Sequence, residues 1–180
     1  MTQATDPLSA TVRSLRQEFD ASFARAPRTA TEPQLSLLAI RLSGNPYALR
    51  VNQIAGLHAD RCITPLPSNV ASLLGVTGLR GQIAPVYDLA SLCGYARTAA
   101  SRWMVLLRPQ EPVALAFECF EMHFTVARDR IVSTPAGMRA SSGNAHVNLV
   151  DAVQHEDLVR PIVDLNALLQ HIQQHAGSPN

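Results

Sequence analysis

Two aspartates and two histidines of this chain have types and spacings that could support catalysis or metal binding. Asp88 and Asp164 occupy the same place in two copies of one pattern, "IAPVYDLASL" and "VRPIVDLNAL", which lie seventy-six positions apart. Paired carboxylates can act as general acid and base. Each of these aspartates, however, ends a predicted strand and precedes leucines at helical spacing. We therefore interpret both as N-caps of short helices and not as a catalytic pair.

The remaining reactive side chains form no known catalytic pattern. His171 and His175 stand four positions apart, the spacing of two metal ligands on one helix face. No carboxylate or cysteine accompanies them in a zinc pattern, so we expect a solvated face and no metal. Ser91 and Cys93 have no nearby histidine in a hydrolase motif, and the glycines near Gly78 precede no phosphate-loop lysine. The sequence predicts no catalytic residue and no cofactor, so we do not expect an enzyme.

Arg80 is flanked by glycines in "GLRGQ", where a tight turn would hold its side chain at the surface. It has two interpretations on the sequence alone. Either it is an exposed turn arginine of little consequence, or its rigid guanidinium binds a carboxylate of another protein through two hydrogen bonds.

The chain from Leu35 onward has the pattern of short β-strands. About ten strand-length apolar runs are separated by turn signals such as Gly44-Asn45-Pro46. The first run, residues 35–42, is apolar on both faces, as in a strand that is covered on both sides. The repeated strand-to-helix pattern indicates two similar units, so we predict a mostly all-β fold of two five-stranded barrels. Leucines at helical spacing over 165–175 predict a short C-terminal helix.

The first 33 residues have a different pattern. One apolar stripe at helical spacing predicts an amphipathic helix, and it consists of Leu8, Val12, Leu15, Phe19 and Phe23. The helix could fold back on the domain, or Phe19 and Phe23 could anchor it in a groove of a partner. We expect a helix and linker over 1–33, the β domain over 34–175 and a tail over 176–180.

Composition argues against several functional classes. The formal net charge is +1 and basic residues do not cluster, so nucleic acid is not an expected partner. No run approaches the roughly 20 apolar residues of a membrane span, and the N-terminus lacks a secretion signal. The three separated cysteines, Cys62, Cys93 and Cys119, are expected to be buried free thiols in a reducing cytosol. Charged residues are only 16% of the chain, which fits either a surface covered by partners or plain β-rich structure.

Three stretches, taken together, resemble the CheW-like domain, the coupling protein of bacterial chemosensory arrays. "LGVTGLRGQIAPVYDL" is similar to the family's Asn-Leu-Arg-Gly turn and the strand after it. "LAIRLSGNPYALRVNQIAGL" resembles its first hairpin, and "LVRPIVDLNALL" resembles its closing strand and helix. The resemblance extends from Leu35 to Ile172. It implies two intertwined SH3-like five-stranded β-barrels with a hydrophobic seam between them.

The same resemblance implies a function and a set of partners. The chain would be a non-catalytic adaptor in the cytoplasm, at receptor arrays on the inner membrane, with no membrane insertion of its own. Its partners would be the regulatory domain of a CheA-type histidine kinase and the cytoplasmic tip of methyl-accepting chemoreceptors. Strand edges and a groove between the barrels would bind them. The implied partner-binding residues are Ile54, Leu57, Val76, Gly78, Leu79, Arg80 and Gly81, with Arg80 the most important.

Two departures from the family pattern concern Arg80. Gly78 replaces the asparagine of the turn, and both residues tolerate a positive φ. Gly56 stands where the family often has an acidic residue that can pair with the turn arginine. Arg80 would then pair with Asp60, or stay open to a carboxylate of another protein. The alternative function is a small-ligand or enzymatic site between the barrels, which would need polar residues converging there.

Overall fold

The computed structural model describes residues 34–96, 101–108, 112–133, 149–155 and 158–176, which belong to one unit of the chain. These residues form two β-sheets and two α-helices. The expected N-terminal helix, with Phe19 and Phe23, lies outside the described residues. No helix in the described ranges is long and apolar enough to cross a membrane.

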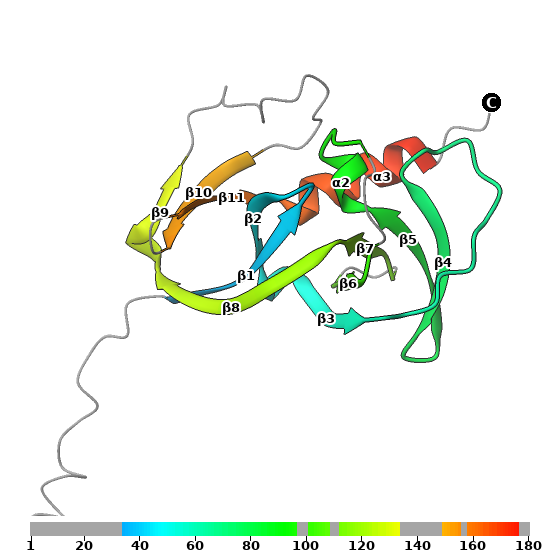
Figure 1. Ribbon diagram of the computed structural model, residues 1–180, viewed down its shortest axis with the longest axis horizontal. Coiled ribbons are helices and arrows are strands. Elements are labelled where there is room, and N and C mark those ends of the chain that lie inside the picture. Colours follow the sequence, from blue (N-terminus) through cyan, green and yellow to red (C-terminus); the bar gives the residue numbers. More distant parts are fainter. Residues whose placement is uncertain (1–33, 97–100, 109–111, 134–148, 156–157, 177–180) are drawn as a thin grey trace, which may run out of the picture. The chain divides into compact units, whose positions relative to one another are not determined.

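The described strands form one sheet of six and one of five (Figure 1). Sheet A has, in spatial order, β8 (Cys119–Ala127), β1 (Gln34–Leu42), β2 (Asn45–Arg50), β11 (Leu158–Val163), β10 (Leu149–His155) and β9 (Ile131–Ser133). Sheet B has β3 (Ile54–Ala59), β6 (Trp103–Leu107), β7 (Ala114–Phe117), β5 (Gln82–Asp88) and β4 (Leu73–Leu79). Short 3₁₀ turns follow β2 and β8, namely η1 (Val51–Gln53) and η2 (Arg128–Arg130). The prediction of a mostly β fold with two similar units is confirmed, and sheet A gains a sixth strand because β9 pairs with β10.

The two sheets have the same topology. Each contains a hairpin, β1–β2 in sheet A and β6–β7 in sheet B. The second strand of each hairpin pairs in parallel with the strand that leads to the capping aspartate, β11 in sheet A and β5 in sheet B. An antiparallel strand flanks each hairpin, β8 or β3, and another flanks each aspartate strand, β10 or β4. Even β9 has a counterpart, because Thr64 forms an isolated bridge with Val76 beside β4.

The chain exchanges strands between its two halves. The hairpin β1–β2 of sheet A is followed in sequence by β3, which belongs to sheet B. In the same way, β6–β7 of sheet B is followed by β8 of sheet A. Each sheet is therefore completed only by strands from both halves. This arrangement explains why one local pattern occurs twice, since each half supplies one closing strand.

Both copies of the repeated pattern end in a capped helix, as the sequence predicted. Asp88 caps α2 (Leu89–Leu92), and its carboxylate accepts a hydrogen bond from the Ser91 amide at 3.1 Å. Asp164 precedes α3 (Leu165–Ala176) and accepts from the Asn166 amide at 3.1 Å. These bonds satisfy amides that a helix start leaves unpaired. The two aspartates therefore have a structural role.

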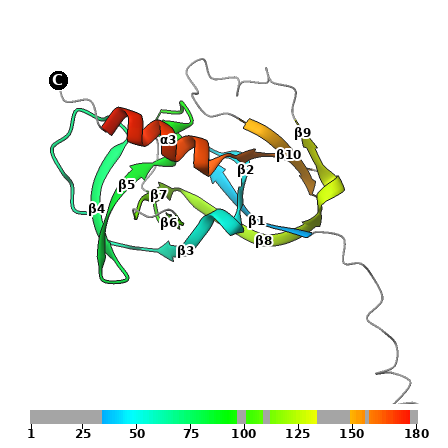
Figure 2. The same ribbon diagram turned by 180° about the vertical axis from the view of Figure 1, so that it is seen from behind.

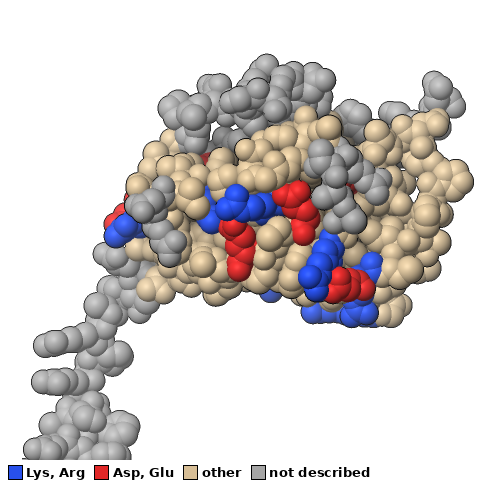
Figure 3. All heavy atoms as spheres, in the orientation of Figure 1, with Lys and Arg blue, Asp and Glu red and all other residues tan. Residues whose placement is uncertain are grey.

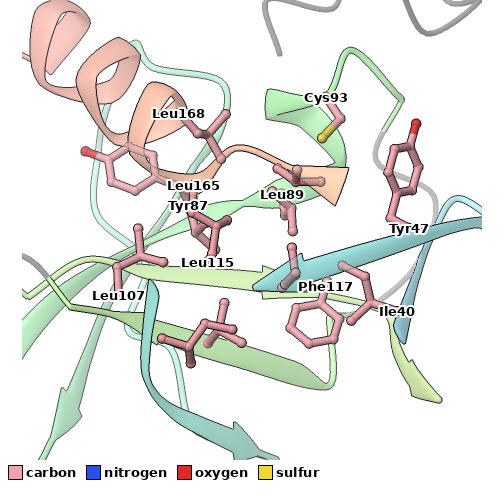
Figure 4. Close-up of a cluster of buried hydrophobic side chains, with 14 of the residues drawn as sticks. Ile40, Tyr47, Tyr87, Leu89, Cys93, Leu107, Leu115, Phe117, Leu165 and Leu168 are labelled. Carbon is pink, nitrogen blue, oxygen red and sulfur yellow. The ribbon is translucent and has the colours of Figure 1, made fainter. Parts of the chain in front are cut away.

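Three apolar clusters make up the core. One lies inside sheet A and another lies inside sheet B. The largest lies between them and combines residues of both sheets with leucines of α2 and α3. In Figure 4, Leu165 and Leu168 of α3 and Leu89 of α2 face Leu115 and Phe117 of β7. The hydrophobic seam implied by the resemblance is present.

The seam is not an open groove over the residues described here. The helix α3 runs along the two sheets in both views (Figures 1 and 2), and its Leu168 and Ile172 are buried in the central cluster. Side chains of α3 fill the part of the seam that the central cluster occupies. The expected inter-barrel groove for partners stays a prediction.

Sheet A encloses a charged group. Arg160 on β11 is only 6% exposed, and its Nη1 lies 2.7 Å from Oε2 of Glu121 on β8. The other oxygen of Glu121 accepts from Arg41 Nε at 2.5 Å. Burial raises the pKa of Glu121, but the hydrogen bonds and charges of Arg41 and Arg160 lower it more, so the pKa lies below its usual 4.5. Glu121 thus links the buried Arg160 to Arg41, whose side chain is 39% exposed.

Candidate protein-interaction surface

The hairpin β4–β5 places Arg80 at its tip. Leu79 pairs with Gln82, so only Arg80 and Gly81 form the turn. Both have positive φ, 51° and 77°, the geometry of a type I′ turn. A non-glycine residue in this region is unfavourable by about 1 kcal/mol or more, and such residues are frequent at functional sites.

Gly78 does not have the role that the sequence suggested. It lies within β4, opposite Ile83, and its φ is not positive. A Cβ added at Gly78 would meet nothing within 4 Å. The glycine therefore leaves the neighbouring Ile83 uncovered and is not required by the turn.

The outer side of this hairpin is an uncharged, apolar surface. Side chains alternate along the strands, so Thr77, Leu79 and Ala84 are buried inside sheet B. The pairs Gly78–Ile83 and Val76–Pro85 lie on the opposite side, which we call the hairpin face. Ile83 is 74% exposed, more than any other large apolar residue in the described part of the chain. Ile83 was missed from the sequence, although the alternation with Ala84 and Val86 could have revealed it.

The other implied partner-binding residues have different environments. Ile54 and Leu79 are 6% and 3% exposed, and both belong to the core. Leu57 is half-buried and packs against the central cluster. Their side chains support β3 and β4 from inside. Among the residues implied by the resemblance, Val76, Gly78, Arg80 and Gly81 come together on one hairpin.

Arg80 extends from the turn to the neighbouring strand β3. Its Nη2 donates a hydrogen bond to the Ala55 carbonyl at 3.0 Å. The guanidinium lies above Gly56, where an added Cβ would be 3.3 Å from Nη2. The suggested partner Asp60 is instead bound by Arg102 at 3.0 Å. Over the described ranges Arg80 has no ion pair, so its positive charge is open to a carboxylate from outside.

His58 adds a second polar group above Gly56. A Cβ on Gly56 would be 2.9 Å from its Nε2, which is shielded from water and has no hydrogen-bond partner among the described residues. Burial lowers the pKa of His58, and the positive charges of Arg61 and Arg80 lower it further. The space above Gly56 is thus surrounded by positive charge and an unpaired ring nitrogen. An incoming carboxylate suits this environment.

A hollow of about 400 Å³ lies beside this group. Arg80 and Arg108 line it together with Leu106 and Leu107, the last two residues of β6. The hollow thus combines two guanidinium groups with apolar walls. Such a combination fits an acidic group that is attached to an apolar segment of a protein.

Sheet A repeats the hairpin face at the same register. On β10 and β11 the equivalent pairs are Gln154–Val159 and Ala152–Pro161, and Val159 is 60% exposed. We call this the second hairpin face. Figure 3 shows charged side chains in small mixed groups on one side of the molecule, with wide uncharged areas between them. The described surface in this view is therefore poor in charge.

The described parts of the chain contain no cluster of potential metal ligands. No three His, Cys, Asp or Glu residues within them lie close enough to hold a metal ion. Of the three cysteines expected to be buried, only Cys93 is, since Cys62 is exposed and Cys119 is half-buried. Burial raises the pKa of the Cys93 thiol to about 12. A thiol with so high a pKa is a poor nucleophile at neutral pH.

The described residues thus form two matched β-barrels, each with an exposed hairpin. The family model for the CheW-like domain matches residues 36–173, and the chain belongs to this family. It is 24% identical to the chemotaxis protein CheW of Bacillus subtilis (strain 168) over 147 residues, which cover 80% of this chain and 92% of that protein. The crystal structure of the scaffolding protein TtCheW from Thermoanaerobacter tengcongensis has a similar fold, with a TM-score of 0.65 and 18% identity over 76% of this chain and 92% of that one.

Proposed function

We propose that this protein is a non-catalytic adaptor that couples chemoreceptors to a CheA-type histidine kinase in a bacterial chemosensory array. The observation that carries the proposal is the pair of equivalent hairpin faces, with Ile83 exposed on one and Val159 on the other. A single chain with two such faces can hold two proteins at once. Membership of the CheW-like family supports this function, as does the scaffolding role named for TtCheW.

In this proposal, the kinase regulatory domain and the cytoplasmic tip of the receptor each contact one outer surface of the adaptor. The protein acts in the cytoplasm, at receptor arrays on the inner membrane. Each contact is of modest size, at or below about 1,600 Å² of total buried area, which is typical of transient complexes. The adaptor makes and breaks no bond. It changes kinase activity because it connects the kinase to the receptor.

Arg80 orients one of these partners. Apolar contact with the hairpin face has no preferred direction, whereas a guanidinium binds a carboxylate in a defined plane. Gly56 has no side chain that could fill the space below Arg80 or pair with its guanidinium. The partner therefore supplies the acidic group. The absence of an internal carboxylate at Gly56 makes the ion pair intermolecular.

The test is a binding measurement on the full chain with a kinase regulatory domain and a receptor-tip fragment, each by titration calorimetry. Arg80→Ala should leave the fold intact and weaken binding to at least one partner about tenfold, the effect of losing a hydrogen bond to a charged group. Arg102→Ala is the matched control, because Arg102 is also an exposed arginine of sheet B but already binds Asp60. The control should bind both partners normally.

Two results would count against the proposal. If the unmodified chain binds neither partner, the adaptor function is wrong. If the unmodified chain binds both and Arg80→Ala changes neither affinity, the adaptor function stands but the role of Arg80 is wrong.

A further inference from the structure

A polar cleft of about 630 Å³ lies where sheet A meets the end of β6 and the first turn of α3. Residues from eight elements line it, namely β1, β2, η1, β6, η2, β9, β10 and α3. Its volume falls within the range of about 300–1,000 Å³ found for small-molecule sites. The cleft is distinct from both hairpin faces, although Arg108 at its edge also lines the hollow beside Arg80.

Three arginines converge on the cleft and face one carboxylate. Arg50 forms an ion pair with Asp151, and Asp151 also accepts from the Ser133 hydroxyl at 3.3 Å. The Asp151 carboxylate therefore already has its partners and does not neutralise the other two arginines. Arg108 is fixed through its Nε, which donates to the Ile54 carbonyl at 2.7 Å. Arg128 is exposed and makes no hydrogen bond or ion pair with the described residues.

The charge balance of the cleft is thus two uncompensated positive charges, from Arg108 and Arg128. The first-turn amides of α3 add little, because Asp164 already accepts from two of them. A single carboxylate would neutralise only one arginine. A phosphomonoester brings about −1.5 to −2 charges and three strong acceptor oxygens at neutral pH. Arginine forks also match the geometry of phosphate.

The rest of the lining is suited to the body of such a ligand. Leu107, Leu165 and Leu169 provide an apolar wall. Gln53 lines the cleft too, and its Oε1 is shielded from water without a hydrogen-bond partner in the described ranges. A buried acceptor without a donor is unfavourable, so a ligand amino or hydroxyl group that donates to it would stabilise the complex.

We propose that this cleft binds a small organic phosphate of mononucleotide size, with the phosphate at Arg108 and Arg128 and the flat body against the leucines. Gln53 accepts a hydrogen bond from a donor group on that body. The site goes beyond the adaptor function, since an adaptor needs no small ligand. It also meets the requirement of the alternative function, because polar residues of both sheets converge at this cleft.

The test uses the full chain and titrates it by calorimetry and saturation-transfer NMR with adenosine 5′-monophosphate and guanosine 5′-monophosphate. Adenosine and citrate serve as probes that lack the phosphate or the flat body. We expect saturable binding of at least one nucleotide and at least tenfold weaker binding of adenosine and of citrate. Arg128→Gln should weaken nucleotide binding about tenfold, because a charged hydrogen bond is lost.

Arg130→Gln is the matched control, since Arg130 is exposed in the same 3₁₀ turn but does not line the cleft. It changes the net charge equally and should leave binding unchanged. The proposal is overturned if neither nucleotide binds saturably, if citrate binds as tightly as the nucleotides, or if both arginine variants weaken binding to the same extent. Each of these outcomes is independent of whether the kinase and the receptor bind.

Discussion

The two halves of this molecule have one topology but different chemistry at equivalent positions. Seventy-six positions separate Ala84 from Arg160, and both face the inside of their sheets. The alanine packs among apolar side chains, whereas the arginine is paired with Glu121, which also binds Arg41. The same offset relates Gly75 to Asp151, and both follow an irregularity in the strand register. The backbone packs closely at Gly75 in sheet B, whereas the equivalent Asp151 in sheet A forms an ion pair with Arg50.

This comparison indicates which features the fold requires and which it leaves free. Both halves keep the alternating strands, the proline, the capping aspartate and the helical leucines. The inward residue before the proline can be alanine or arginine, provided that the barrel supplies a partner for the charge. The tips differ as well, since the sequence has Arg80-Gly81 in one and Glu156-Asp157 in the other, the latter outside the described residues. Two hairpins with opposite charge would suit two different partners.

The largest expected effect comes from breaking the charged cluster of sheet A. Glu121→Ala should lower the free energy of unfolding by about 3 kcal/mol, because it leaves Arg160 buried without a counter-charge. The loss is measured by urea unfolding, followed by the fluorescence of the single tryptophan. The double variant Glu121→Leu, Arg160→Leu removes both charges and should recover most of the stability. A loss below about 1 kcal/mol for the single variant would show that the buried arginine does not depend on Glu121.

In sheet B, the corresponding weak point is steric. Gly75 has a φ of +139°, and an added Cβ would be 2.0 Å from the Thr64 carbonyl oxygen. Gly75→Ala should therefore cost about 2–3 kcal/mol of unfolding free energy, through backbone strain and loss of the Thr64–Val76 bridge. Gly44→Ala is the control, since its φ is also positive but its Cβ would meet nothing within 4 Å. Equal losses for the two variants would contradict the steric explanation.

Much of the fold could be predicted because its signals are local. The caps at Asp88 and Asp164 depend on a few adjacent residues, and both were predicted. The first strand was predicted to be covered on both faces, and Leu37 and Ile40 do lie in different clusters. Intertwined barrels were expected, but which strands are exchanged could not be predicted, since the pairing of β2 with β11 joins segments over a hundred residues apart. No local pattern specifies that choice.

The candidate site was predicted less completely, for a related reason. The resemblance pointed to Arg80 and its turn, and these are exposed on the hairpin. It could not separate surface residues from supporting ones, so Ile54 and Leu79 were named although they are buried. It also gave no sign that Arg160 would be buried, because an arginine in "LVRPIV" has the same appearance as one at an edge. Burial depends on which distant strands cover a residue.

Lowering the pH is expected to have a smaller effect on the free energy of unfolding, again through Glu121 of sheet A. The folded-state pKa of Glu121 lies below its usual 4.5. As the pH falls, the Glu121 carboxylate is therefore protonated at a higher pH in the unfolded chain than in the folded one. The stabilising contribution of the carboxylate is complete above about pH 4.5 and is lost as the pH falls through the folded-state pKa. The stability difference between the unmodified chain and Glu121→Gln should therefore shrink from pH 7 to pH 3. Urea unfolding at several pH values measures it, and a constant or growing difference would contradict the assignment.

The smallest expected change in stability comes from the two hairpin faces, where the comparison between the halves bears on function. Ile83→Ser and Val159→Ser alter exposed positions, so each should change the unfolding free energy by no more than about 0.5 kcal/mol. Their effects on binding should differ, because Arg80 adjoins only the first face. If each variant weakens a different partner, the duplicated hairpins have become two separate sites on one adaptor. If both variants weaken the same partner equally, the two faces form parts of a single interface, and the halves of the molecule have diverged in their interiors but not in what they bind.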